Sequence, residues 1–147
     1  MKTAFDSSTK ARAISNWAVT RIHEINTRLT EIAQVLRDIQ LKRDGVILLE
    51  LYDCSRNCLG CPHPRWIQWK WHKNKIRNNW IGHRISGDPI PKLKRSDSFA
   101  DTYAERLQLS REVKSLIAER SSIIKRLSDL DRIRNMRETH RQPLGEG

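Results

Sequence analysis

The chain has 147 residues, and its 28 lysines and arginines outnumber 17 aspartates and glutamates to give a formal net charge of +11. This length suits a single domain, and three cysteines exclude the disulfide-rich class of secreted proteins. No run is apolar enough for a signal peptide or a membrane span, so we expect a cytoplasmic protein without membrane contact.

The first predicted element is a long helix over residues 8–43. Its apolar residues alternate at four and three steps, which is the spacing of a heptad seam. The seam comprises Ala18, Ile22, Ile25, Leu29, Ile32, Leu36 and Ile39, and Trp17 and Val35 widen the stripe. Asp44-Gly45 supplies a stop signal for this helix.

Residues 45–95 are predicted to form a compact insert with a small antiparallel sheet. The three runs "GVILLELY", "RWIQWKWHK" and "NWIGHRI" are rich in β-branched and aromatic residues, as strands are. On the middle run Ile67, Trp69 and Trp71 share one face, and the opposite face carries Trp66, Gln68, Lys70 and His72. One face of this strand is therefore apolar, and the other is mixed and cationic.

All three cysteines of the chain lie in the insert, where Cys54, Cys58, Cys61 and His63 form the pattern C-x3-C-x2-C-x-H. Three thiolates and one imidazole are the donors that tetrahedral zinc prefers. We therefore predict one structural Zn²⁺ that replaces the apolar core an insert of this size lacks. His72 and His83 are alternative fourth ligands. The alternative to a metal site is a set of three reduced, buried cysteines beside a histidine that binds no metal.

Four protein ligands close a zinc site, and a closed site is structural rather than catalytic. Zn²⁺ with three thiolates carries a net charge of −1. Arg56 and Arg65 are expected to offset this charge and to donate hydrogen bonds to sulfur.

The positive charge of the chain is concentrated after the cysteines, since residues 62–95 carry nine basic side chains and one acidic one. Cations that neutralise phosphates and flat rings that stack on bases are typical of proteins that bind single strands or RNA. The candidate nucleic-acid contacts are Arg65, Lys70, Lys73, Lys75, Arg77, Arg84, Lys92, Lys94, Arg95, Trp66 and Trp80. Trp69 and Trp71 are expected to pack inside the insert instead.

A second long helix is predicted over residues 97–138, followed by a tail at 139–147. Ser98 and Asp101 can form its capping box. Its seam runs through Leu109, Val113, Leu116, Ile123, Leu127 and Leu130. Arg120 occupies a seam position, where it either extends outward and sets the register of the helices or contacts a phosphate or carboxylate.

Together these elements predict an α+β fold that is predominantly helical. Two long antiparallel helices would form a coiled-coil hairpin, and the zinc-stapled β insert would sit at one end. The same seams could pair between two chains to form a homodimer, or pack on another protein.

The order Tyr52, Cys54, Cys58, Cys61, His63-Pro64, aromatic strand and long C-terminal helix resembles a family of small bacterial proteins associated with mobile elements. Those proteins carry a His-Gly-Pro, tyrosines in the strand and a Gly-Lys turn, where this chain has Pro-His-Pro, tryptophans and Asn74-Lys75. The resemblance implies a zinc-stapled sheet on a helical hairpin in a plasmid, phage or transposon setting, and it implies no particular activity.

These features predict a nucleic-acid-binding accessory protein of a mobile element or phage, whose basic aromatic insert contacts the phosphate backbone. The alternative is a protein-binding inhibitor or adaptor, for example an anti-CRISPR or other anti-defence factor, that docks on a nucleoprotein complex. An enzyme is not expected, because the sequence has no phosphate loop and no acidic cluster, and His83 with Asp88 is weak evidence for acid-base chemistry.

Overall fold

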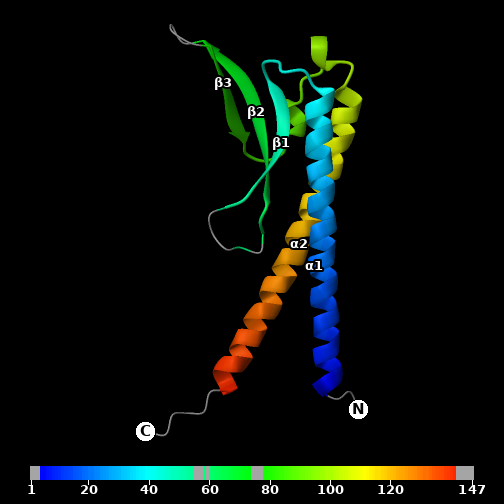
Figure 1. Ribbon diagram of the computed structural model, residues 1–147, viewed down its shortest axis with the longest axis vertical. Helices are drawn as coiled ribbons and strands as arrows, with labels where there is room; N and C mark the ends of the chain where they lie inside the picture. Colours follow the sequence, from blue (N-terminus) through cyan, green and yellow to red (C-terminus); the bar gives the residue numbers. More distant parts are fainter. Residues whose placement is uncertain (1–3, 55–57, 59, 74–77, 142–147) are drawn as a thin grey trace.

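The computed structural model of the chain describes residues 4–54, 58, 60–73 and 78–141. It contains two long helices and a three-stranded antiparallel sheet (Figure 1). The helices are α1 (Ala4–Ile39) and α2 (Tyr103–Arg141). The strands are β1 (Val46–Tyr52), β2 (His63–Lys73) and β3 (Asn78–Ile85), in the order β1-β2-β3. The predicted α+β class and the three strands are confirmed.

The helices run antiparallel, pack closely where they adjoin the sheet and diverge toward the start of α1 and the end of α2 (Figure 1). The predicted seam of α1 is buried from Ala18 to Leu36, whereas Trp17 is 56 % exposed. On α2, Val113 and Ile123 are buried, but Leu130 is 39 % exposed. The seams therefore meet within one chain along only part of the helices, which is less than the full hairpin that was predicted.

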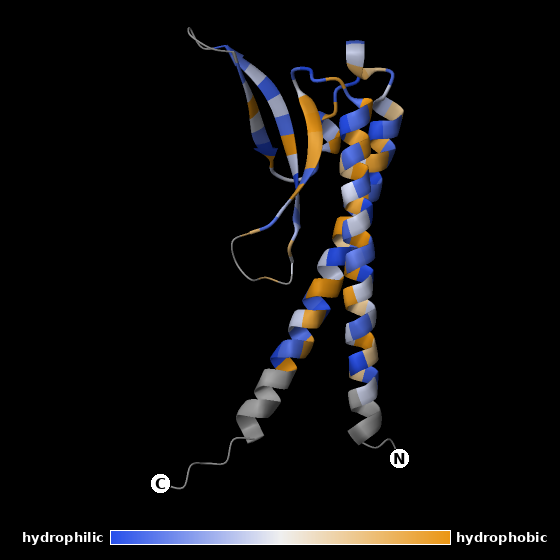
Figure 2. Cartoon of the chain, viewed as in Figure 1, coloured by the Kyte–Doolittle hydropathy of each residue, from blue (hydrophilic) through white to orange (hydrophobic). Residues whose placement is uncertain are grey.

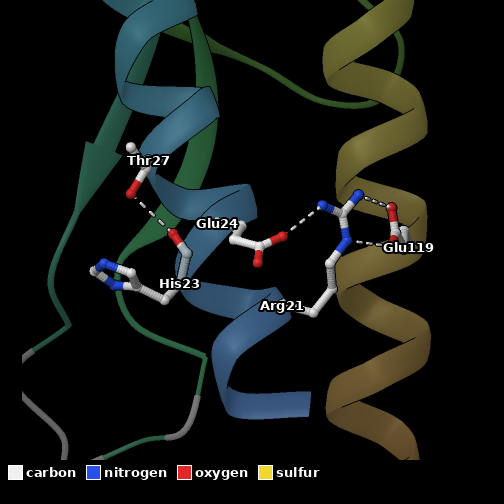
Figure 3. A network of polar contacts seen from close by, with 5 residues as sticks. All are labelled: Arg21, His23, Glu24, Thr27 and Glu119. Atoms are coloured by element: carbon white, nitrogen blue, oxygen red, sulfur yellow. Dashed lines mark hydrogen bonds and ion pairs between the residues drawn. The ribbon is translucent and has the colours of Figure 1, made fainter. Parts of the chain in front are cut away.

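Paired charges fix the register of the helices. Arg21 donates two hydrogen bonds to Glu119, from Nε at 2.7 Å and from Nη2 at 2.9 Å (Figure 3). One heptad later on α1, and one heptad earlier on α2, Arg28 binds Glu112 through the same two nitrogens at 2.7 and 3.0 Å. Two identical bridges one heptad apart are possible only if the two helices run in opposite directions.

The ends of the helices differ from the prediction. α1 ends at Ile39, where the Gln40 side chain donates to the carbonyls of Leu36 and Ile47, at 2.8 and 3.2 Å. α2 begins at Tyr103 because residues Asp97–Phe99 form a 3-10 turn, and Ser98 therefore does not cap the helix. The helix continues to Arg141, into the segment predicted to be a tail.

The sheet packs against the helices through β1 and through one row of side chains. Leu49 pairs with Trp66, and Trp66 pairs with Ile85, so these three residues form a row across the strands on the face toward the helices. All three are buried and belong to the same core cluster as the helix seams. Figure 2 shows hydrophobic residues concentrated on β1, and hydrophobic residues alternating with hydrophilic ones along both helices. The far ends of β2 and β3 extend beyond this contact (Figure 1).

Candidate metal centre and aromatic face

The four predicted metal ligands converge on one point. Cys54 follows the end of β1, His63 begins β2, and Cys58 and Cys61 lie in the connection between them. The three sulfur atoms lie 3.1 to 3.3 Å from one another, and Cys58 Sγ lies 3.2 Å from His63 Nε2. All four ligand atoms lie within 4.8 Å of one another. His63, and not His72 or His83, is therefore the histidine of this cluster.

The donor set fits a tetrahedral zinc ion. Zn–S bonds of about 2.3 Å place thiolates about 3.8 Å apart around the ion, so each sulfur needs to move by only a few tenths of an ångström. The backbone N–H of Cys54 points at Cys61 Sγ from 3.4 Å, which stabilises a thiolate. Four soft or borderline donors without a carboxylate favour Zn²⁺ over magnesium or calcium.

Crowding of the thiols affects their ionisation. The hydrogen bond with the Cys54 side chain is the main cause that raises the pKa of Cys61 to about 11. Near neutral pH this group therefore keeps its proton unless a cation takes the proton's place. Binding of a metal ion at this cluster would therefore release a proton.

Arg120 of α2 reaches into the cysteine loop. Its Nη2 donates to the carbonyl oxygens of Gly60 and Pro62, the latter at 2.6 Å, and its Nε donates to Asn26 Oδ1 of α1 at 2.9 Å. The residue is only 5 % exposed. Burial lowers the pKa of its guanidinium, and the charges of Cys61 and Cys58 act in the opposite direction. Of the two alternatives predicted for Arg120, the one in which it extends outward is wrong, because α2 buries the side chain against the backbone of this loop.

Arg65, which was predicted to offset the charge of the zinc site, has other partners. Its Nη2 lies 3.2 Å from Glu50 Oε2, and its guanidinium lies 4.5 Å from the centre of the Tyr52 ring. Tyr52 in turn contacts the His63 ring, with the ring centres 5.4 Å apart. Arg65 therefore supports the ligand histidine through Tyr52, and Arg120 is the buried cation beside the sulfur atoms. Arg56 lies outside the described residues.

The sheet face that points away from the helices carries three tryptophans. The Trp69 and Trp80 rings are stacked, with centres 6.0 Å apart and planes at 11°, and Trp71 is tilted against Trp80 at 4.8 Å. Trp71 is 42 % exposed. Gly82 makes room for this arrangement, because a Cβ there would lie 3.1 Å from the Trp69 ring. We call Trp69, Trp71 and Trp80 the aromatic face.

The expected roles of two tryptophans are reversed. Trp66 was a candidate nucleic-acid contact, but it is 7 % exposed and lies in the core toward the helices. Trp71 was expected to be buried and is exposed instead. The strand alternation was correct, but the helices cover the face that looked mixed in the sequence, where Trp66 pairs with Leu49 and Ile85.

The predicted cationic contacts divide between the two faces of the sheet. Lys73 and Arg84 are exposed and lie on the side of the aromatic face, as the strand register requires. Lys70 is exposed on the opposite side, together with His72 and His83, whose Nε2 atoms lie 2.8 Å apart. Lys75 and Arg77 lie outside the described residues.

The other three predicted cations lie beyond the sheet. Lys92 is exposed in the 3-10 turn Ile90–Lys92. Lys94 donates to the Asp44 carbonyl at 3.1 Å, and the Arg95 guanidinium lies 5.3 Å from the centre of the Tyr103 ring. Lys94 lines an open hollow together with Trp71 of β2, and Lys92 and Arg95 do not line it.

Two further cations, Lys42 and Arg106, were not among the site residues predicted from the sequence. Lys42 Nζ lies 5.1 Å from the centre of the Trp71 ring and 5.2 Å from that of Trp80. Arg106 is 2 % exposed and donates to the carbonyls of Lys94 and Phe99 at 2.7 and 2.5 Å. A cation three residues before the first seam leucine of α2 was the available signal for Arg106. No local pattern indicates that Lys42 reaches the tryptophans.

No protein-family model matches the chain, and neither a curated protein nor a solved structure gives a significant match. Within the described residues, neither helix is apolar over enough of its length to cross a membrane. The resemblance to mobile-element proteins stays a prediction.

Proposed function

We propose that this chain is a single-stranded nucleic-acid-binding protein whose sheet is held in place by one structural zinc ion. The aromatic face carries the proposal. It presents an exposed Trp71 beside Trp80, with Lys42 over both rings. Flat rings offer stacking surfaces to any base, each stacked base contributes about 1 to 3 kcal/mol, and neighbouring cations neutralise the backbone.

The geometry favours a single strand over a duplex. Bases in a duplex are stacked on one another and cannot reach a tryptophan ring without being flipped out, which costs a few kcal/mol. Lys73 and Arg84 flank the rings on the same side of the sheet and are exposed. A strand that crosses the aromatic face would therefore meet cations near both ends of the ring cluster.

The proposed zinc ion is bound by Cys54, Cys58, Cys61 and His63, whose ligand atoms already lie together. When bound, it supplies a fixed tetrahedral junction and no reaction chemistry. The protein residues then fix the end of β1 relative to the start of β2, and Arg120 places a positive charge beside the anionic cluster. We infer a reducing cytoplasmic setting, and the motif resemblance supports a phage, plasmid or transposon source.

The test is fluorescence anisotropy of the zinc-analysed protein with labelled single- and double-stranded DNA and RNA across a salt series. We expect one zinc per chain and a preference for single strands, with affinity that falls as salt rises. The variant Lys73→Glu with Arg84→Glu should lose at least tenfold in affinity. Lys125→Glu with Arg126→Glu makes the same charge change on an exposed part of α2 and should lose far less. Equal losses in both pairs would reject the aromatic face as the binding site.

A second candidate function is that of a protein-binding adaptor or inhibitor, such as an anti-defence factor. It is favoured by exposed apolar side chains in the first half of α1 and the last part of α2: Ile14, Trp17, Val19, Leu130 and Ile133. Such residues typically form contacts with a partner protein or with a second copy of the chain. If Trp17→Ser with Ile133→Ser changes the molar mass of the protein in solution, and Lys73→Glu with Arg84→Glu leaves binding to single strands unchanged, this candidate replaces the first.

A further inference from the structure

An open hollow of about 850 Å³ lies beside the aromatic face. Three segments surround it: the turn between α1 and β1, the far part of β2, and the loop before α2. Its lining includes Lys42, Arg43, Lys94, Trp71, Ser96 and Ser98. Its volume lies within the range of sites for small ligands.

The charges of the lining favour an anion. Lys42, Arg43 and Lys94 contribute three positive charges, against two negative charges from Asp44 and Asp97. The Asp44 carboxylate already accepts a hydrogen bond of 2.7 Å from the backbone N–H of Trp71. Its negative charge is thus partly committed within the protein, whereas Lys42 and Arg43 are exposed at the hollow.

The aromatic part of the lining narrows the ligand class. Trp71 is 42 % exposed, and its ring contacts the ammonium group of Lys42. A cation over an aromatic ring is held by modest attraction, so a flat base can take its place while the lysine moves to a phosphate. An apolar ligand would leave the cations of the lining unused, and a simple anion would leave the ring unused. A nucleotide has both a flat base that can stack on the ring and a phosphate that the cations can bind.

We propose that this hollow binds one nucleotide unit, with its base on Trp71 and its phosphate between Lys42, Arg43 and Lys94. The hydroxyls of Ser96 and Ser98 line the same space and can donate to phosphate oxygens. Arg106 holds the backbone of this loop through the carbonyls of Lys94 and Phe99, so the phosphate side of the hollow has a rigid support.

The inference rests on the proposed function and names one position at which the protein would bind a nucleotide of the strand. Trp71 belongs both to the hollow and to the aromatic face, so a strand on that face places one of its nucleotides here. The same chemistry would accept a free mononucleotide. Comparing the affinity for a short oligonucleotide with that for adenosine monophosphate shows whether the hollow binds a nucleotide of a strand or a free one.

The experiment uses the full chain labelled with 5-fluorotryptophan and follows its ¹⁹F NMR spectrum, in which Trp71→Phe identifies the Trp71 signal. The probes are a six-nucleotide oligodeoxyadenylate, adenosine monophosphate and inorganic phosphate. The test variant is Lys42→Gln with Arg43→Gln. Its control is Lys92→Gln, which removes an exposed cation two residues from Lys94 that does not line the hollow. Circular dichroism verifies that each variant is folded.

We expect the oligonucleotide to shift the Trp71 signal, and the test variant to lose at least tenfold in affinity. Its salt slope should fall by about 0.7 for each cation removed. Lys92→Gln should stay within about twofold of wild type. A shift with adenosine monophosphate of similar affinity would assign the hollow to free nucleotides rather than to a strand.

Three outcomes would overturn the inference. If inorganic phosphate produces the same Trp71 shift as the nucleotide, the hollow is only an anion site. If the oligonucleotide binds the test variant as tightly as wild type, while Lys73→Glu with Arg84→Glu abolishes binding, the hollow is excluded and the proposed function stands. If no probe binds the wild-type protein, both are rejected.

Discussion

Arg106 and Arg120 lie two heptads apart on α2, and each guanidinium ends on backbone carbonyls of a loop. Arg106 binds the loop that precedes the helix, through Lys94 and Phe99. Arg120 binds the cysteine loop, through Gly60 and Pro62. Arginine suits both positions because its planar fork donates several hydrogen bonds from one buried group. α2 therefore holds both the loop that leads into it and the loop that joins β1 to β2.

Replacing Arg120 should weaken the link between the helices and the cysteine loop. In Arg120→Met the carbonyls of Gly60 and Pro62 lose their charged donor, and we expect a loss of about 2 to 4 kcal/mol in the free energy of unfolding. Arg126→Met, at an exposed site on the same helix, should cost less than about 0.5 kcal/mol. Urea denaturation measures both. Comparable losses would show that the Arg120 contacts add little.

Removing the metal should unfold the cysteine loop and loosen the sheet. We expect zinc binding at pH 7.5 to release protons, because the Cys61 thiol has a pKa of about 11 and must lose its proton to bind the ion. His63→Ala should weaken zinc binding by at least a hundredfold, whereas His72→Ala should leave it unchanged. Competition with a chromophoric chelator measures the affinities. A strong effect of His72→Ala on zinc affinity would show that His72, and not His63, is the fourth ligand.

The helix pairing should weaken in acid. The hydrogen bond with Arg28 holds the pKa of Glu112 below its usual range, so the pair stabilises the fold above that range and loses this effect as the pH falls through the lowered pKa. Glu112→Gln should cost about 0.5 kcal/mol at pH 7, because both side chains are partly exposed, and nothing at pH 2. Thermal unfolding at both pH values measures the difference. A cost that persists at pH 2 would have to come from packing.

The two sides of β2 should respond oppositely to loss of a tryptophan. Trp66→Ala should destabilise the fold by about 3 to 5 kcal/mol, because the ring is buried among the helix and sheet side chains. Trp71→Ala should cost under about 1 kcal/mol but reduce affinity for single strands by about tenfold or more. Denaturation and anisotropy on the same two proteins separate the roles. Loss of binding without loss of stability in Trp66→Ala would contradict this assignment.

A side chain at Gly82 should disturb the aromatic face. The space for its Cβ is limited by the Trp69 ring at 3.1 Å and by Ile67 Cγ2 at 2.8 Å, so Gly82→Val must displace a neighbour. We expect a cost of about 1 to 3 kcal/mol and loss of the stacking between Trp69 and Trp80. Near-ultraviolet circular dichroism reports the stacking, and the adjacent Ile81→Val serves as control. An unchanged spectrum in Gly82→Val would show that the rings can adjust.

Much of the fold could be predicted because its signals are local. Heptad spacing indicated both helices, alternation indicated which residues of β2 share a face, and the spacing of Cys54, Cys58, Cys61 and His63 identified the ligand cluster. The sequence does not show which side of the sheet is buried, because both faces of β2 carry a tryptophan, Trp66 on one and Trp71 on the other. Only the contact with α1 and α2 distinguishes them. The partners of Arg120 lie 58, 60 and 94 residues away in the chain, so no local pattern contains them.

The contacts of Arg120 have a consequence for the lifetime of the protein in a cell. Arg120 belongs to α2, and its guanidinium binds both Asn26 of α1 and the loop that holds the proposed zinc ligands. If that loop opens when zinc is scarce, Arg120 loses its two carbonyl acceptors, and this loss weakens the helix pair and favours the partly open forms that proteases recognise. Abundance of the protein would then follow the supply of zinc, and starvation for the metal would remove the protein rather than merely inactivate it.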